Sequence, residues 1–167
     1  GEAASVAAYD ALRTALASPP QGYTLGTVEI TPPVVADFRF GVARRTDGSL
    51  ELTGHVASES AREEIRAAAA QAAEGAAIDD RLRDARGLPQ GVDGPALARF
   101  VFRLAVLLHK GRVAFEGASV SVEGNALDAG AITEVETLMR DARPAGVAAG
   151  RVALTARPIV PYVLRIR

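Results

Sequence analysis

Two stretches of the chain, one starting 70 residues after the other, follow the same pattern: residues 50–58 (LELTGHVAS) and residues 120–128 (VSVEGNALD). In each stretch apolar and polar residues alternate, which is typical of a half-buried β-strand. A glycine, Gly54 or Gly124, follows at the same step, and each stretch ends in a residue that can cap a helix. The chain is therefore predicted to contain the same strand–helix unit twice.

A second similarity links the beginning of the chain to its end, at an offset of 124 residues. The matching segments are residues 20–22 with 144–146, 28–30 with 152–154, and 35–40 with 159–164. We interpret residues 1–34 as the tail of a preceding repeat, consisting of a helix and a strand. Residues 35–90 are then one repeat, and residues 91–167 a second one that ends in the first strand of a next unit. This interpretation places the chain within a longer repeating protein.

Hydrophobic spacing and turn residues predict the individual elements. The expected helices are Ala4–Ala17, Ser60–Glu74, Pro95–His109 and Ala129–Ala142. The expected strands are Thr24–Thr31, Phe38–Arg45, Leu50–Val56, Ala76–Asp84, Arg112–Glu116, Ser119–Glu123, Arg151–Ala156 and Pro161–Ile166. Ser60 and Glu63 stand at the spacing of a capping box. Tandem α-β-β-α-β repeats of this kind predict an α+β fold, in which helices pack on one face of a mixed sheet.

The two motifs, Leu-x-Leu-x-Gly-x-Val and Val-x-Val-x-Gly-x-Ala, each followed by a capped helix and a strand, resemble the BON (bacterial OsmY and nodulation) domain. Residues 52–62, with the run from Pro144 to Tyr162, are similar to envelope proteins of the OmpA family that carry tandem BON-like repeats. The resemblance implies a periplasmic, outer-membrane-associated module that contacts phospholipid, another envelope protein or its own copies. In that family a C-terminal domain binds peptidoglycan, and its residues are not in this chain.

No pattern in the sequence indicates catalysis, a metal or a cofactor. The chain has no cysteine and two histidines, His55 and His109, for which structural or surface roles are expected. Asp79 and Asp80 are adjacent, so on a strand they point to opposite faces and cannot easily share an ion. Phosphate-binding loops and the nucleophile-elbow motif are absent. The repeated glycines Gly54 and Gly124 are predicted to be required by the backbone, for a positive φ, a bulge or the close approach of a helix at these positions.

Arg99 and Arg103 are the candidate contact residues. They lie four apart on one side of an otherwise apolar predicted helix, where they form either a narrow solvent-facing stripe or an anchor for lipid phosphate or a partner carboxylate. The net charge of −1 argues against a nucleic-acid partner, since such proteins carry a basic excess. The most apolar segment, residues 96–108, is too short to span a membrane, so no transmembrane segment is expected.

The sequence thus predicts a non-enzymatic module, periplasmic by resemblance, that makes phospholipid or protein contacts in the envelope. Self-association is a further possibility within this hypothesis, because the exposed edge of a sheet tends to pair with a strand of another chain. One alternative is a structural spacer that holds a peptidoglycan-binding domain away from the membrane. Another, from a different class, is a soluble hydrolase-type enzyme that uses carboxylates and arginines around residues 79–81.

Overall fold

The computed structural model describes residues 1–157. Its helices are α1 (Val6–Ala17), α2 (Glu59–Ala73), α3 (Gly94–Ala105) and α4 (Ala129–Asp141). Its strands are β1 (Arg39–Arg44), β2 (Leu50–Val56), β3 (Ile78–Asp84), β4 (Leu108–Glu116), β5 (Ser119–Ala126) and β6 (Ala148–Ala156). The fold is therefore α+β, as the sequence predicts.

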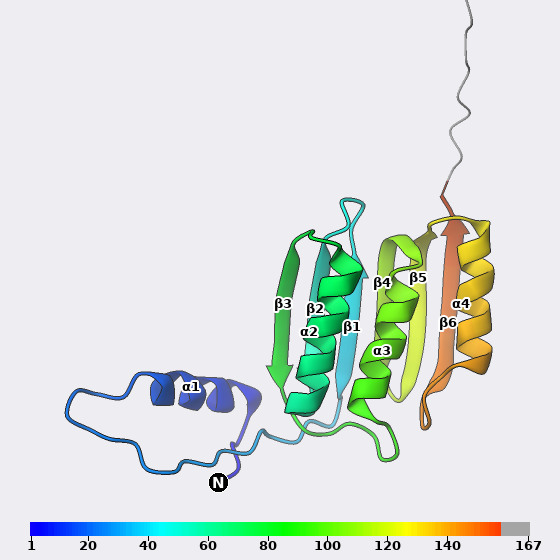
Figure 1. Cartoon of the computed structure of the whole chain (residues 1–167). Helices are drawn as coiled ribbons and strands as arrows, with labels where there is room; N and C mark the ends of the chain where they lie inside the picture. The colour runs from blue at the N-terminus through cyan, green and yellow to red at the C-terminus, as the bar shows by residue number, and fades with distance from the viewer. Residues whose placement is uncertain (158–167) are drawn as a thin grey trace, which may run out of the picture.

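The six strands form one sheet in the order β3-β2-β1-β4-β5-β6 (Figure 1). The central strands β2, β1, β4 and β5 pair antiparallel with one another. The outer strands β3 and β6 run parallel to β2 and β5. A parallel pair needs a long crossover connection, and α2 and α4 supply these two crossovers. The sheet is thus mixed, and β3 and β6 form its two edges.

The order strand, strand, helix, strand occurs twice, as β1-β2-α2-β3 and as β4-β5-α4-β6. The two units meet where β1 pairs antiparallel with β4, at pairs such as Phe40 with Phe115. Antiparallel pairing of equivalent strands relates the two units by an approximate twofold rotation about an axis normal to the sheet. Residues 50–58 and 120–128 occupy equivalent places in the two units, since each covers the second strand and the cap of the next helix.

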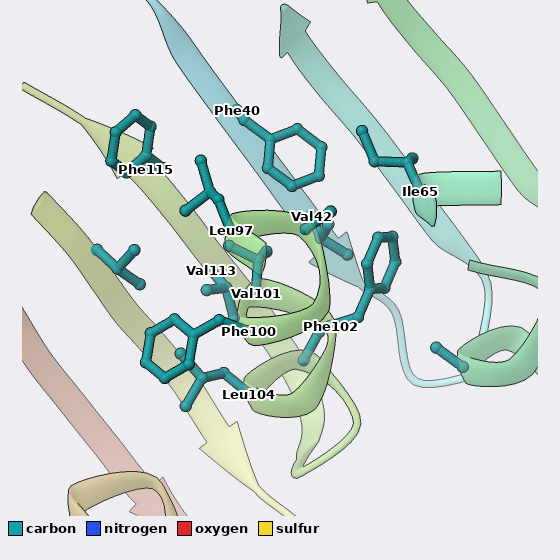
Figure 2. Close-up of a cluster of buried hydrophobic side chains, with 14 of the residues drawn as sticks. Phe40, Val42, Ile65, Leu97, Phe100, Val101, Phe102, Leu104, Val113 and Phe115 are labelled. Atoms are coloured by element: carbon teal, nitrogen blue, oxygen red, sulfur yellow. The ribbon is translucent and has the colours of Figure 1, made fainter. Parts of the chain in front are cut away.

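Helices α2, α3 and α4 cover one face of the sheet, and α3 lies over the seam between β1 and β4 (Figure 1). Figure 2 shows the apolar side chains of α3 fanning out over these strands. Phe102 of α3 packs against Phe40 of β1, with 6.4 Å between ring centroids. The largest fully buried side chains are Val42, Leu50, Leu52, Val101, Leu104, Leu108, Val113, Phe115, Val120, Val122 and Val135. One apolar core therefore joins both units.

Side chains cap the two crossover helices. Ser58 Oγ accepts a hydrogen bond from the backbone N–H three residues later, at 3.2 Å, and Asp128 Oδ1 does the same at 2.7 Å. Each cap satisfies a backbone donor that the first turn of a helix leaves unpaired. Because Ser58 holds this position, the capping box predicted at Ser60 and Glu63 is wrong.

Helix α1 lies apart from the other three helices, below the end of β3 in Figure 1, and buries none of its side chains. Two ion pairs link it to β3: Asp10 Oδ2 is 3.9 Å from Arg83 Nε, and Arg13 Nη1 is 2.6 Å from Asp84 Oδ2. Arg62 of α2 reaches the other oxygen of the same carboxylate at 2.7 Å. The expectation that helices pack on one face therefore holds for α2, α3 and α4 but not for α1.

The strand expected at Thr24–Thr31 is wrong. Its only β-pairing is an isolated bridge between Thr31 and Glu2, and residues 24–30 belong to no strand. The alternation of apolar residues needs a neighbouring strand to become a ladder, and none lies beside this segment. Leu25 and Val28 consequently remain about half exposed.

The helix expected at Pro95–His109 is shorter than predicted. It ends at Ala105, where the N–H of Val106 bonds to Phe102 O and the N–H of Leu107 to Leu104 O. Leu108 already pairs with Ala126 in the sheet, so tertiary pairing overrides local helix propensity. The expected strand Pro161–Ile166 lies outside the described residues. Within residues 1–157, no helix has the length and apolar character needed to cross a bilayer.

Candidate interaction surfaces

Arg99 and Arg103 both point to solvent from α3, as their spacing predicts. Arg99 Nη1 lies 3.2 Å from Glu64 Oε2 of α2, whereas Arg103 forms no ion pair with any residue that the structure describes. The flanking helices carry the acidic residues Glu59, Glu63 and Glu64 on α2 and Glu134, Glu136 and Asp141 on α4. The same helices also carry Arg62 and Arg66 on α2 and Arg140 on α4, and Glu64 is the one acidic residue that the structure pairs with this arginine pair within residues 1–157.

Gly54 and Gly124 sit at equivalent places in β2 and β5. Their φ angles are +102° and +130°, in the left-handed region that side chains disfavour. A Cβ at Gly54 would collide with the backbone carbonyl of Arg39, and one at Gly124 with the carbonyl of Lys110. Both glycines therefore let a neighbouring strand approach closely, which is a structural role.

The sheet face opposite helices α2, α3 and α4 is uncovered, and we call it the open face. Strand alternation places every second side chain here. The small or uncharged ones include Gly41, Ala43, Thr53, Ala114, Ser121, Asn125, Ala153 and Thr155. The charged ones are Arg39, Glu51, Asp79, Arg81, Arg83, Lys110, Arg112, Glu116, Glu123 and Arg151. Basic residues outnumber acidic ones on this face, although the whole chain has a net charge of −1.

The charges on the two halves of the open face are paired differently. On the β3 side, Arg81 lies 2.6 Å from Asp79 and 3.6 Å from Glu51. On the β6 side, Arg112 lies 3.6 Å from Glu116, but neither Lys110 nor Arg151 forms an ion pair within residues 1–157. Within residues 1–157 the unpaired charges of this half are therefore the cations Lys110 and Arg151 and the carboxylate of Glu123.

A trough of about 250 Å³ lies in this half of the open face. Arg112, Glu116, Glu123 and Arg151 supply its charged walls, and Ser121 lies between them. The guanidinium of Arg112 extends over Gly41 of the adjacent strand, where a Cβ would come within 3.5 Å of two of its nitrogens. Guanidinium groups held at a shallow polar surface suit phosphate and carboxylate oxygens.

Asp79 and Asp80 lie on opposite faces of β3. Asp79 is on the open face with Arg81, while Asp80 accepts a hydrogen bond from the Leu82 N–H at 3.0 Å. The two carboxylates therefore do not converge on one substrate or ion. Across residues 1–157, no group of three potential metal-binding side chains is assembled.

The two histidines lie in strands β2 and β4, so the expectation that His109 ends a helix is wrong. The His55 ring packs beside Phe38, with 5.6 Å between ring centroids, and its Nδ1 accepts the Arg39 N–H at 3.4 Å. Burial lowers the pKa of His55 below its usual 6.5 and nearby Arg39 and Arg83 add to this, whereas Asp37 opposes it. The folded state therefore favours the neutral imidazole.

This pKa shift predicts a loss of stability in mild acid. The unfolded chain takes up a proton near pH 6.5, but folded His55 resists it, so stability falls as the pH drops below that value. We expect His55→Asn, which copies Asn125 of the other unit, to flatten this slope between about pH 7 and pH 5. Urea unfolding at several pH values measures it, with His109→Asn as the control. An unchanged slope in His55→Asn would contradict the assignment.

Sequence reasoning found the α3 arginines but missed the open face. Arg112, Ala114 and Glu116 alternate with the buried Val113 and Phe115 along β4, and the sequence shows this alternation. What the sequence lacked was the order of the strands, which brings Arg151 beside Ser121 and Arg112. Comparison of the chain with protein-family models and with curated proteins gave no match in either case.

Proposed function

We propose that this chain is a non-enzymatic, BON-like interaction module of the bacterial cell envelope, located in the periplasm and associated with the outer membrane. Its role is to bind anionic groups through the open face, and the main ligand proposed is the headgroup of a phospholipid. The observation that supports this most is the distribution of charge. A chain of net charge −1 gathers Lys110, Arg112 and Arg151 on one uncovered sheet surface.

The geometry of these three cations supports contact with phosphate. Arg112 lies directly opposite Glu123 in the ladder between β4 and β5 and is 3.6 Å from Glu116, and its side chain stays about half exposed. Each basic residue near an anionic membrane surface contributes about 1 kcal/mol of attraction. Glu116 and Glu123 share this half of the face with the three basic residues, so its net charge is +1 and the binding is weak and reversible.

The open face is a better site for this contact than the pair Arg99 and Arg103 on α3. Arg99 is already engaged by Glu64 at 3.2 Å, whereas neither Lys110 nor Arg151 of the open face forms an ion pair within residues 1–157. The pair Arg99 and Arg103 is therefore expected to contribute less than the open face.

The contact is electrostatic and does not involve insertion into the bilayer. Among the exposed large apolar side chains of residues 1–157, only Ile78 and Val152 belong to strands, and their pairing with the buried Leu50 and Val122 places both on the face that carries the helices. Phe40 and Phe115 point into the core, so the face also lacks the aromatic platforms that stack nucleic-acid bases. Binding should consequently weaken as salt rises.

Co-sedimentation with vesicles tests this proposal. At low ionic strength we expect the chain to sediment with vesicles that contain phosphatidylglycerol and to remain in the supernatant with phosphatidylcholine alone. Raising the salt to about 0.5 M should release it, since the screening length falls to about 4 Å. If the chain stays in the supernatant with anionic vesicles at low salt, phospholipid is not its ligand. The module would then act by binding a protein partner.

A further inference from the structure

The two edges of the sheet differ although they occupy equivalent places. Edge strand β3 carries the charged residues Asp79, Asp80, Arg81, Arg83 and Asp84, and α1 is tied to its end through Arg13. Edge strand β6 (AAGRVALTA) carries Arg151 as its only charged residue. Charged side chains and covering segments are the usual protection of an edge against pairing with another chain. Strand β3 has both, whereas β6 has a single charge, a register shift between Ala149 and Val152, and no covering segment at its edge within the described residues.

Hydrogen bonds show which backbone groups of β6 point away from the sheet. The N–H of Arg151 bonds to Ser121 Oγ at 3.1 Å, and the N–H of Arg157 bonds to Ala126 O at 3.1 Å, so both point inward toward β5. Backbone groups of successive residues alternate in direction along a strand. The N–H and C=O groups of Val152, Leu154 and Ala156 consequently point outward.

We propose that β6 is the site at which two copies of the chain pair, antiparallel and edge to edge, with Ala153 at the twofold axis. The outward-pointing backbone N–H and C=O groups of the two copies must face each other. An even-numbered residue of one copy therefore pairs with an even-numbered residue of the other. An axis at Leu154 would place Arg151 opposite Arg157 of the second copy, and like charges opposite each other are destabilising. An axis at Ala153 instead places Arg151 opposite Thr155 and Val152 opposite Leu154.

The second copy is the occupant because this edge complements itself. In this register the backbone of Val152 in each copy exchanges hydrogen bonds with the backbone of Leu154 in the other copy, so the twofold axis produces two such pairs. The side chains of both residues lie on the face that carries the helices. A twofold axis normal to the sheet keeps the helices of both copies on one side and extends the sheet across the pair. The contact is one strand wide, below the size of stable interfaces, so the dimer is weak and concentration-dependent.

A single cysteine tests the register, because the chain has none of its own. In Ala153→Cys the two thiols would meet at a non-hydrogen-bonded antiparallel pair, where Cα atoms lie about 4.5 Å apart, within disulfide range. Thr155→Cys is the matched control on the same face, because the two copies of residue 155 would lie about 14 Å apart. We expect oxidation at high protein concentration to cross-link the first variant at least about tenfold faster than the second.

A second substitution and an exchange measurement complete the test. Val152→Lys, at a site already 36 % exposed, should leave the monomer folded and suppress the cross-linking of Ala153→Cys. The amides of Val152 and Leu154 should exchange rapidly in dilute solution and slowly in concentrated solution.

Three results would overturn the proposal. Equal cross-linking of the two cysteine variants would exclude the register. A dimer that forms without the residue-153 cross-link would point to another occupant, such as residues 24–31 of a neighbouring copy. Protection of both amides at every concentration would show that the edge is covered within one chain.

Discussion

Replacing Gly124 by alanine is expected to lower the free energy of unfolding by about 3 kcal/mol, as is the equivalent change at Gly54. Two causes act together. The positive φ angles disfavour any side chain, and the added Cβ would overlap a backbone carbonyl of the neighbouring strand. At Gly124 the Cβ would also lie 2.5 Å from the Cα of Gly111. Backbone atoms cannot rotate away as a side chain can, so the strands must separate.

Gly75→Ala is the matched control for this prediction. Gly75 has a φ of +90°, but nothing lies within 4 Å of a Cβ built there. It isolates the cost of the backbone conformation, about 1 kcal/mol. Chemical denaturation of the three variants gives the comparison. A free energy of unfolding equal to that of the parent in both Gly54→Ala and Gly124→Ala would refute the close-approach role.

Phe115→Ala is expected to destabilise the chain by about 4 kcal/mol. Phe115 is fully buried in β4 and pairs with Phe40 across the seam between the two units, so its loss leaves a cavity under α3. Because the core runs through both units, we expect a single cooperative transition at a lower midpoint. Phe115→Leu, which keeps most of the volume, should cost about 1 kcal/mol.

Calorimetry and denaturant curves followed by two probes would measure this effect. Two separate transitions in the Phe115→Ala variant would show that the units fold independently, against the account of one shared core. A loss below about 1 kcal/mol would show that the seam carries little of the stability.

Local patterns predicted the elements that depend on local chemistry. Alternation gave the bounds of β2 at Leu50–Val56, and Ser58 and Asp128 were recognised as residues able to cap the helices that follow. The failures came where a partner element decides the outcome. Residues 24–31 alternate like a strand but have no strand beside them, and Leu108 and His109 continue a helical pattern but pair in β4.

The same distinction between local patterns and partner elements applies to the two candidate surfaces. Arg99 and Arg103 could be found from their spacing on one helix, because helical periodicity alone puts them on one side. The open face could not, since it requires knowing that β4, β5 and β6 are neighbours and that the helices cover the opposite face. Charge patterns along single strands become a surface only once strand order and register are known.

The most direct test of the central claim compares two pairs of charge-removing substitutions in vesicle binding. Lys110→Gln with Arg151→Gln acts on the open face, and Arg99→Gln with Arg103→Gln acts on α3, so both double variants lose the same charge. Each lost contact is worth about 1 kcal/mol, so the first pair should weaken binding to anionic vesicles at low salt by about tenfold or more. The α3 pair should change it by less than about twofold. Greater loss in the α3 pair, or equal loss in both, would contradict the assignment of function to the open face.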